Sequence, residues 1–183
     1  IWLMSGTTLL SAPVIAGAPP NWTVAGVGDF NGDGHADILW RDTAGNNAIW
    51  LMNGTVLLSA PVIAGAPPNW SVVGIGDFNG DGKSDIVWRD KSNGNNAVWL
   101  MDGTTLLSAP VIAGAPTTWS VVGVGDFNGD GKADIVWRDT SGNNAVWLMN
   151  GTALISAPVI AGAPPNWIVA GVGDFNGDGK TDI

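Results

Sequence analysis

Short apolar runs and glycine-rich turns follow one another along the whole chain in a pattern that repeats. One repeat extends from Trp70 to Pro116. It opens with a β-rich run, Trp70 to Gly76, whose two glycines mark close backbone approach, as expected of an innermost strand. A second run, Asp85 to Asp90, is apolar on both faces, which indicates a strand covered from both sides. We therefore expect sheets that stack against one another.

The second half of the repeat predicts a hairpin. Residues 97–101 form a third apolar run, and Asp102-Gly103 predicts a tight turn, because Asp-Gly tolerates the positive φ angles that such turns require. We expect the fourth strand over Thr105 to Ile112. It contains Pro110, which cannot donate to a ladder, so this strand belongs at the outer edge of a sheet. Four antiparallel strands with inner glycines and an outer proline are typical of a propeller blade.

A nine-residue stretch that begins Asp-Phe-Asn-Gly-Asp-Gly sets the phase of the repeat. It starts at Asp29, Asp77, Asp126 and Asp174, so the spacing is 48, 49 and 48 residues. A period of this size with strand-like segments lies in the range of propeller blades. We predict an all-β fold, a β-propeller built from four-stranded antiparallel blades with about four repeats of 48–49 residues.

The repeat boundaries divide a single array, residues 1–183, into whole and half blades. Whole blades are expected at 22–66, 70–115 and 119–163, a half blade with strands three and four at 1–18, and a half blade with strand one, its loop and the start of strand two at 167–183. Joined together, the two halves would still lack about ten residues, those corresponding to Val136 to Ala145. Nearly identical blades accept one another's surfaces. We therefore expect a fragment of a longer array, or a homo-oligomer in which chains pair through their end blades.

The repeated aspartate stretch has the chemistry of a calcium loop. Calcium takes six to eight oxygen ligands, and a glycine-containing loop supplies them from alternate positions. In the second copy, position 1 is Asp77, position 3 is Asn79, position 5 is Asp81 and position 9 is Asp85. Position 7, Lys83, would donate its backbone carbonyl. Three carboxylates that converge on one point would repel one another strongly without a cation.

The same five positions are the expected metal ligands in every copy. The full set is Asp29, Asn31, Asp33, His35, Asp37, Asp77, Asn79, Asp81, Lys83, Asp85, Asp126, Asn128, Asp130, Lys132, Asp134, Asp174, Asn176, Asp178, Lys180 and Asp182. Position 7 is His in one copy and Lys in three, which matters little if only its carbonyl binds. Position 12, where an EF-hand needs Glu, holds Trp in the first three copies, so these loops are not EF-hands. We expect one Ca²⁺ per loop, up to four; the alternative is a cluster of Asx-Gly turns without metal.

Composition narrows the function. The net charge is −9, there is no Glu, and 12 of the 16 Asp lie in the four loops; four divalent cations would bring the formal charge to about −1. Seven Lys and Arg form no basic patch, which disfavours nucleic acid as a partner, and no apolar run is long enough to span a bilayer. The chain lacks Cys, Glu and Tyr, and its one histidine is absent from the equivalent loops. We therefore expect no catalytic site and no enzyme activity.

Residues 126–139, Asp-Phe-Asn-Gly-Asp-Gly-Lys-Ala-Asp-Ile-Val-Trp-Arg-Asp, resemble the FG-GAP, or VCBS, repeat family. That family is known from the head of integrin α subunits and from secreted bacterial proteins. The resemblance implies a β-propeller, often of seven blades, with calcium in the loop between strands one and two. It also implies a secreted or cell-surface module for binding or adhesion, with an extracellular protein or glycan as ligand. The alternatives are a glycan-binding lectin and a self-assembling structural or accessory module of a larger secreted protein.

A candidate ligand surface lies away from the loops. Because strand direction alternates, we expect the aspartate loops and the Asn-Gly or Asp-Gly hairpins on one rim. The opposite rim then gathers the residues Trp70, Arg89, Asp90, Asn95 and Asn96. An aromatic face beside planar hydrogen-bonding groups suits a sugar. The competing interpretation is packing between blades, with Arg and Asp pairing to close the rim.

Overall fold

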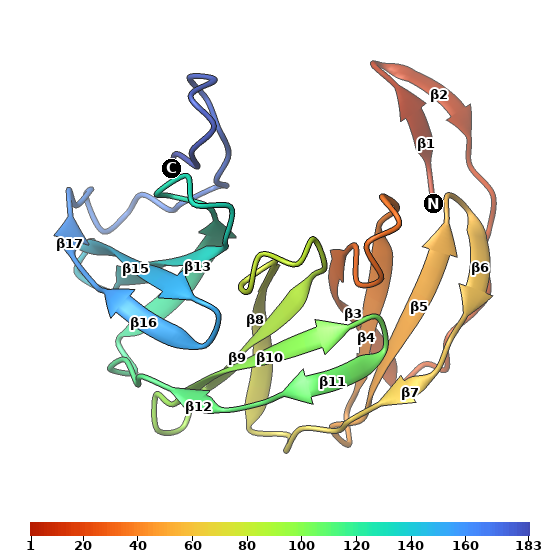
Figure 1. The fold of residues 1–183 in the computed structure, drawn as a ribbon, viewed down its shortest axis with the longest axis horizontal. Coiled ribbons are helices and arrows are strands. Elements are labelled where there is room, and N and C mark those ends of the chain that lie inside the picture. The colour runs from red at the N-terminus through yellow and green to blue at the C-terminus, as the bar shows by residue number, and fades with distance from the viewer.

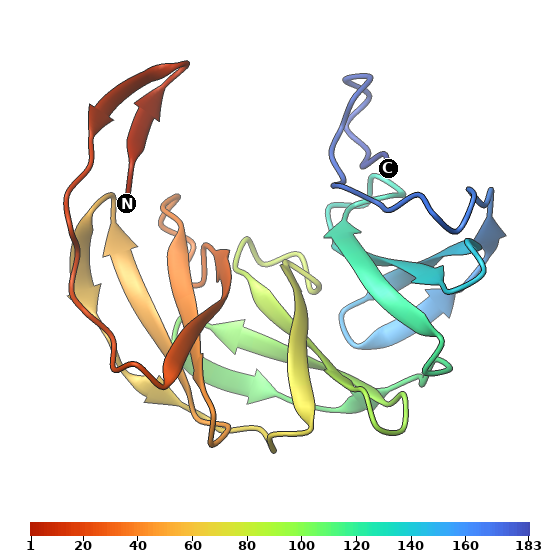
Figure 2. The same ribbon diagram turned by 180° about the vertical axis from the view of Figure 1, so that it is seen from behind.

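The computed structural model describes residues 1–183, and it consists of strands, turns and loops without any helix. Three blades stand side by side along an open arc, with a hairpin at the N-terminal end and a looser segment at the C-terminal end (Figures 1 and 2). The predicted all-β, propeller-like arrangement of antiparallel blades is confirmed, and no sheet closes on itself. No helix is present that could cross a membrane.

Each blade is a sheet whose first four strands pair antiparallel in chain order, while a short fifth strand pairs with the third. The first blade contains β3 (Trp22–Gly28), β4 (Asp37–Asp42), β5 (Asn47–Asn53), β6 (Val56–Ser59) and β7 (Val62–Ile63). The second contains β8 (Trp70–Gly76), β9 (Asp85–Asp90), β10 (Asn96–Asp102), β11 (Thr105–Ser108) and β12 (Val111–Ile112). The third contains β13 (Trp119–Gly125), β14 (Asp134–Asp139), β15 (Asn144–Asn150), β16 (Ala153–Ser156) and β17 (Val159–Ile160).

The two chain ends supply parts of further blades that lie apart. At the N-terminus, β1 (Leu3–Ser5) pairs only with β2 (Thr8–Ser11). At the C-terminus, the segment after β17 forms the fourth aspartate loop, closed by a bridge between Gly173 and Asp182. The expected half blades therefore do not complete one another within one chain, and they face each other across the opening of the arc (Figure 1).

The outer strand differs from its prediction. A single strand was expected over Thr105 to Ile112, but the chain forms two short strands, β11 and β12, separated by Ala109-Pro110. Both pair with β10, and the register shifts between Leu100 and Met101. Proline has no N–H to donate, so the ladder is interrupted there and resumes one residue later.

The hydrophobic core lies between blades. One cluster joins Phe78, Val87 and Val98 of the second blade to Ile135 and Trp137 of the third. Strand two is covered on both faces, and every residue of β9 is buried. In each blade the tryptophans of strands two and three pack together with ring centroids 4.7 to 4.9 Å apart. A blade is therefore stabilised mainly by its neighbours.

Candidate calcium loops and the opposite rim

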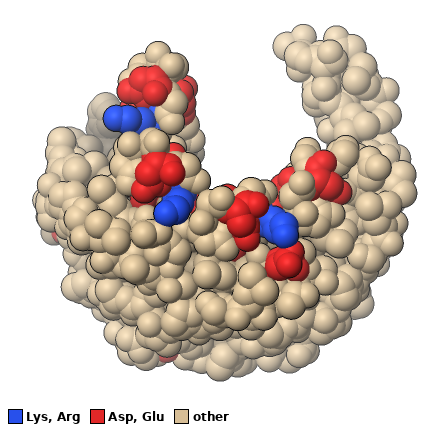
Figure 3. Space-filling view, in the orientation of Figure 1, with Lys and Arg blue, Asp and Glu red and all other residues tan.

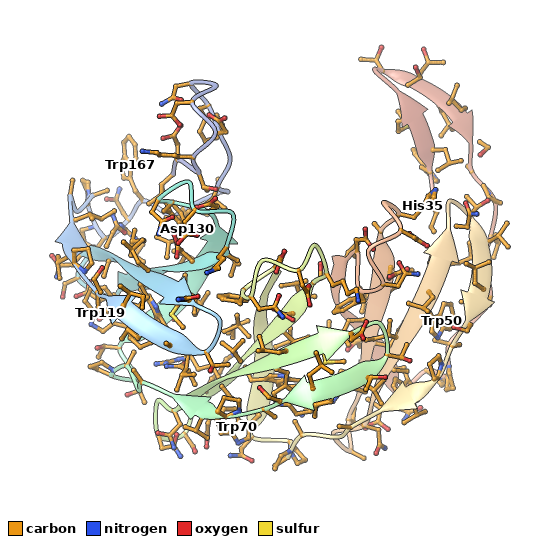
Figure 4. The ribbon with its side chains drawn as sticks, in the orientation of Figure 1. His35, Trp50, Trp70, Trp119, Asp130 and Trp167 are labelled. Carbon is orange, nitrogen blue, oxygen red and sulfur yellow. The ribbon has the colours of Figure 1, made fainter.

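Each of the first three aspartate loops connects strand one of a blade to strand two, and the fourth is closed by the bridge between Gly173 and Asp182. The glycines at positions 4 and 6 have positive φ, 78° at Gly80 and 81° at Gly82 in the second loop, which a residue with a side chain adopts only under strain. The acidic residues of the four loops form separate clusters that follow the inner side of the arc (Figure 3), and His35 and Asp130 mark two of these loops (Figure 4).

Backbone amides fix the carboxylate at position 1. In the second loop, Asp77 Oδ1 accepts hydrogen bonds from the N–H groups of Gly80 at 2.7 Å and Asp81 at 3.2 Å, and its Oδ2 accepts from Gly82 at 2.7 Å. The side-chain oxygen of Asn79 accepts from Asp81 N–H at 3.0 Å. The other three loops repeat these bonds. The sequence therefore folds into the same loop four times.

The carboxylate at position 9 is buried and connects the loop to strand three. Asp85 is fully buried; its Oδ1 accepts from Met101 N–H at 2.8 Å and its Oδ2 from Phe78 N–H at 2.9 Å. The pKa of Asp85 is raised to about 6: burial is the largest cause, the two amide hydrogen bonds lower the pKa, and the negative charges of Asp81 and Asp77 contribute to raising it. Burial likewise raises the pKa of the equivalent carboxyls in the first and third loops, Asp37 and Asp134.

In the second and third loops, the side chain at position 7 contacts the hairpin that follows strand three of the same blade. The ammonium group of Lys83 pairs with Asp102, and Lys132 Nζ donates to Asn150 Oδ1 at 2.6 Å. Both partners lie in the tight turns after strand three. The loops and these hairpins therefore share one rim, as the alternation of strand direction predicts. In the first loop, His35 at position 7 instead contacts Asp33 of its own loop, with Nδ1 3.2 Å from Oδ1.

The donor set suits calcium, although the side chains are not gathered into a metal cluster. No group of three or more His, Asp or Glu side chains is arranged to hold a metal ion, so the expected convergence of three carboxylates is not seen. The reason is that the carboxylate oxygens at positions 1 and 9 are directed to backbone amides. Carboxylate, amide and carbonyl oxygens are nevertheless the ligands that calcium prefers. The negative charges of Asp81 and Asp77 contribute to raising the pKa of the buried Asp85, and a cation in the loop would relieve this like-charge repulsion.

An arginine closes the opposite rim between blades. Arg89 is only 3% exposed, and its guanidinium stacks 4.9 Å from the ring of Trp137 in the next blade. The guanidinium donates to five acceptors, Gly94 O at 3.2 Å, Asn96 Oδ1 at 2.9 Å, Ala115 O at 3.1 Å, Pro116 O at 2.8 Å and Trp119 O at 3.0 Å. Ala115 and Pro116 belong to the connection into the third blade, and Trp119 is the first residue of β13. Arg41 and Arg138 make the same set of bonds in their blades.

The expected pairing of Arg with Asp on this rim was wrong. No ion pair joins Arg89 to Asp90, because the arginine donors are taken by carbonyls while Asp90 caps its own turn. Asp90 Oδ1 accepts from Ser92 N–H at 2.9 Å and from its hydroxyl at 2.6 Å, and Oδ2 accepts from Asn69 Nδ2 at 2.8 Å. The sequence analysis did not predict the arginine contact across blades. The Trp-Arg-Asp tripeptide that recurs in every blade was the sequence signal that could have indicated it.

The five candidate ligand residues do not form an accessible polar pocket. Arg89, Asp90 and Asn96 are buried, Trp70 is half-buried, and only Asn95 is exposed. Asn96 donates its amide to Ala113 O at 2.8 Å and accepts from the arginine. The groups that a sugar would need are therefore occupied by the chain itself, and the glycan pocket stays a prediction.

The fold and the four loops define a propeller-like repeat protein with one aspartate loop per blade. A profile of the FG-GAP-like repeat matches residues 29–88, 77–137 and 126–183, and each matched segment begins at the first aspartate of a loop. The chain belongs to the FG-GAP-like repeat family. No curated protein matches the chain.

Proposed function

We propose that this chain is a secreted or cell-surface binding and adhesion module whose blades are stabilised by calcium in the aspartate loops. Repeats of this family are usually found in extracellular, typically non-catalytic binding modules. The observation that carries the calcium proposal is the buried Asp85, which lies in the field of Asp77 and Asp81 and whose pKa is raised to about 6.

Calcium would be held by the oxygens at positions 1, 3, 5 and 9 and by the carbonyl at position 7. Its role is structural, because each of the first three loops joins the first two strands of its blade and also contacts the loop that follows it in the next repeat. The N–H of Ser84 in the second loop donates to Asp29 O in the first at 2.7 Å. An ion present at 100 times its dissociation constant stabilises the folded state by about 2.7 kcal/mol per site. Extracellular calcium would keep even modest sites filled.

Calorimetric titration and thermal melting test the metal. We expect heat of binding with up to four calcium ions per chain and a higher melting temperature in calcium than in chelator. Asp77→Asn should remove one site, whereas Asp102→Asn, an exposed carboxylate in a hairpin of the same rim, should leave the stoichiometry unchanged. Absence of both binding heat and a melting shift at millimolar calcium would refute the proposal.

The ligand is tested separately from the metal. The calcium-loaded chain is screened against arrays of extracellular proteins and of glycans, each also with chelator. Calcium-dependent capture of a protein supports the adhesion module. A blank glycan array at millimolar calcium contradicts the lectin alternative, for which the buried groups at Arg89 give no support.

A further inference from the structure

A hollow of about 230 Å³ opens between the second and third blades, on the rim opposite the aspartate loops. Trp119, labelled in Figure 4, is one of its lining residues. The full lining is Val73, Arg89, Lys91, Thr117, Trp119, Ser120 and Val121. Both blades that form the hollow have all their strands, so it belongs to a complete junction between blades.

Two departures from the repeat meet at this hollow. The turn after strand two is one residue longer in the second blade, and Lys91 stands there in place of Thr43 and Thr140. The N–H groups of Thr43 and Thr140 donate to carbonyls of the connection before their own blade, at 3.2 and 3.1 Å, whereas Lys91 makes no such bond. Thr117 replaces a proline, Pro68 in the preceding connection. The hollow therefore has an ammonium group where the other blades have a hydroxyl, and a hydroxyl where the first junction has a proline ring.

The buried Arg89 adds a positive charge that no carboxylate balances. The side chain is 3% exposed, and its five acceptors are all neutral oxygens. Asp90 is engaged by its own turn and by Asn69. Burial lowers the pKa of both Arg41 and Arg89, but only at Arg41 does a neighbouring carboxylate, Asp42, act to raise it. Buried charges are normally paired, so the hollow favours an anion.

The polar groups of the hollow are donors without acceptors. Arg89 uses Nη1 and Nη2 for its five bonds, and its Nε–H makes none. Lys91, Thr117 and Ser120 are exposed, and their side chains are unpaired. No carboxylate or amide side chain lines the hollow. A carboxylate only accepts hydrogen bonds, whereas sugar hydroxyls need donors and acceptors together, so this lining suits a carboxylate better than a sugar.

We propose that this hollow binds an acidic side chain of a partner protein. Lys91 pairs with the carboxylate, the free donors of Arg89, Thr117 and Ser120 surround it, and the apolar surface beside them receives the methylene stem. That surface is formed by Val73, Trp119 and Val121. The proposal rests on the proposed binding function and names the chemistry of the partner. It does not depend on calcium, because the hollow lies on the rim opposite the loops.

Nuclear magnetic resonance titration of the isotope-labelled chain in calcium buffer tests the site. The probe is the capped peptide Gly-Ser-Glu-Gly-Ser, and the same peptide with Gln in place of Glu is its control. We expect saturable shifts of the amide signals of Lys91 and of residues 117–121 with the Glu peptide only.

Two variants assign the binding to Lys91. Lys91→Thr introduces the residue that the other two blades carry, so its melting temperature should match that of the native chain. It should weaken binding of the Glu peptide about tenfold or more, because a hydrogen bond between charged groups is lost. Thr43→Asp makes the same change in net charge at the equivalent position of the first blade, and it should bind like the native chain.

The proposal is overturned if the Glu and Gln peptides bind equally, if neither gives a saturable shift, or if Lys91→Thr binds as the native chain does. Tighter binding of galacturonic acid than of the Glu peptide would also overturn it, since the recognised carboxylate would then belong to a sugar. Calcium titration and the protein array on the same samples separate the two proposals. A chain that binds calcium and captures proteins but not the Glu peptide refutes this site alone. Binding of the Glu peptide by a chain that takes no calcium supports this site and refutes the calcium proposal.

Discussion

The buried arginine contact between blades predicts a large loss of stability on Arg89→Met. Methionine keeps much of the apolar stem but removes all five hydrogen bonds and the stacking on Trp137. A buried acceptor that loses its donor costs about 1–3 kcal/mol. The five acceptors lie close together and relax together, so their costs do not add in full. We expect the free energy of unfolding to fall by about 3 kcal/mol or more, the cost of several acceptors that lose their donor at once.

Urea unfolding followed by tryptophan fluorescence measures this loss, and Arg138→Met is the internal comparison. Arg138 makes the same five bonds, but the segment that it holds ends in Trp167, which is 65% exposed. Water reaches the released carbonyls there, so Arg138→Met should lower the free energy of unfolding by clearly less than Arg89→Met does. A loss below about 1 kcal/mol for Arg89→Met, the worth of one ordinary hydrogen bond, would refute the reasoning, as would equal losses for the two variants.

Two further outcomes are expected. In chelator, the free energy of unfolding should decrease as pH rises from about 4 to about 6. The pKa of Asp85 in the folded state, about 6, exceeds its ordinary value of 3.8, so the protonated carboxyl favours the folded state below this window. The contribution of Asp85 to the free energy of unfolding is at most about 3 kcal/mol. Calcium should flatten this dependence in melting experiments, and Asp85→Asn should reduce it, because the pKa values of Asp37 and Asp134 are raised in the same direction. Stability that rises with pH across the window in chelator would contradict the prediction. Phe78→Ala should lower the free energy of unfolding, measured in urea, by about 3–5 kcal/mol because the ring is fully buried. The matched Phe175→Ala should lower it little because that ring is 76% exposed. Similar losses for both variants would show that the next blade does not decide burial.

Much of the architecture follows from local sequence. The predicted strands Trp70–Gly76 and Asp85–Asp90 agree with β8 and β9 to the residue. The Asp102-Gly103 turn forms with a φ of 61° at the glycine, because the residues of a tight turn carry the backbone freedom that it needs. The split of the outer strand at Pro110 was missed, since the pattern shows that proline lacks a donor but not how the ladder rearranges around it.

By itself, the sequence determined the repeat, the strands, the hairpin turns and the form of the aspartate loop, because these depend on residues that are close in the chain. Only the tertiary structure decided which polar groups and side chains remain free to contact a ligand and which are occupied within the chain. Arg89 finds three of its acceptors 26 to 30 residues further on, in the connection to the next blade, so it closes the rim instead of offering donors to a sugar. The same Asp-Phe-Asn-Gly loop leaves Phe78 fully buried and Phe175 76% exposed. Identical local sequences fold alike, but burial depends on whether a following blade covers them.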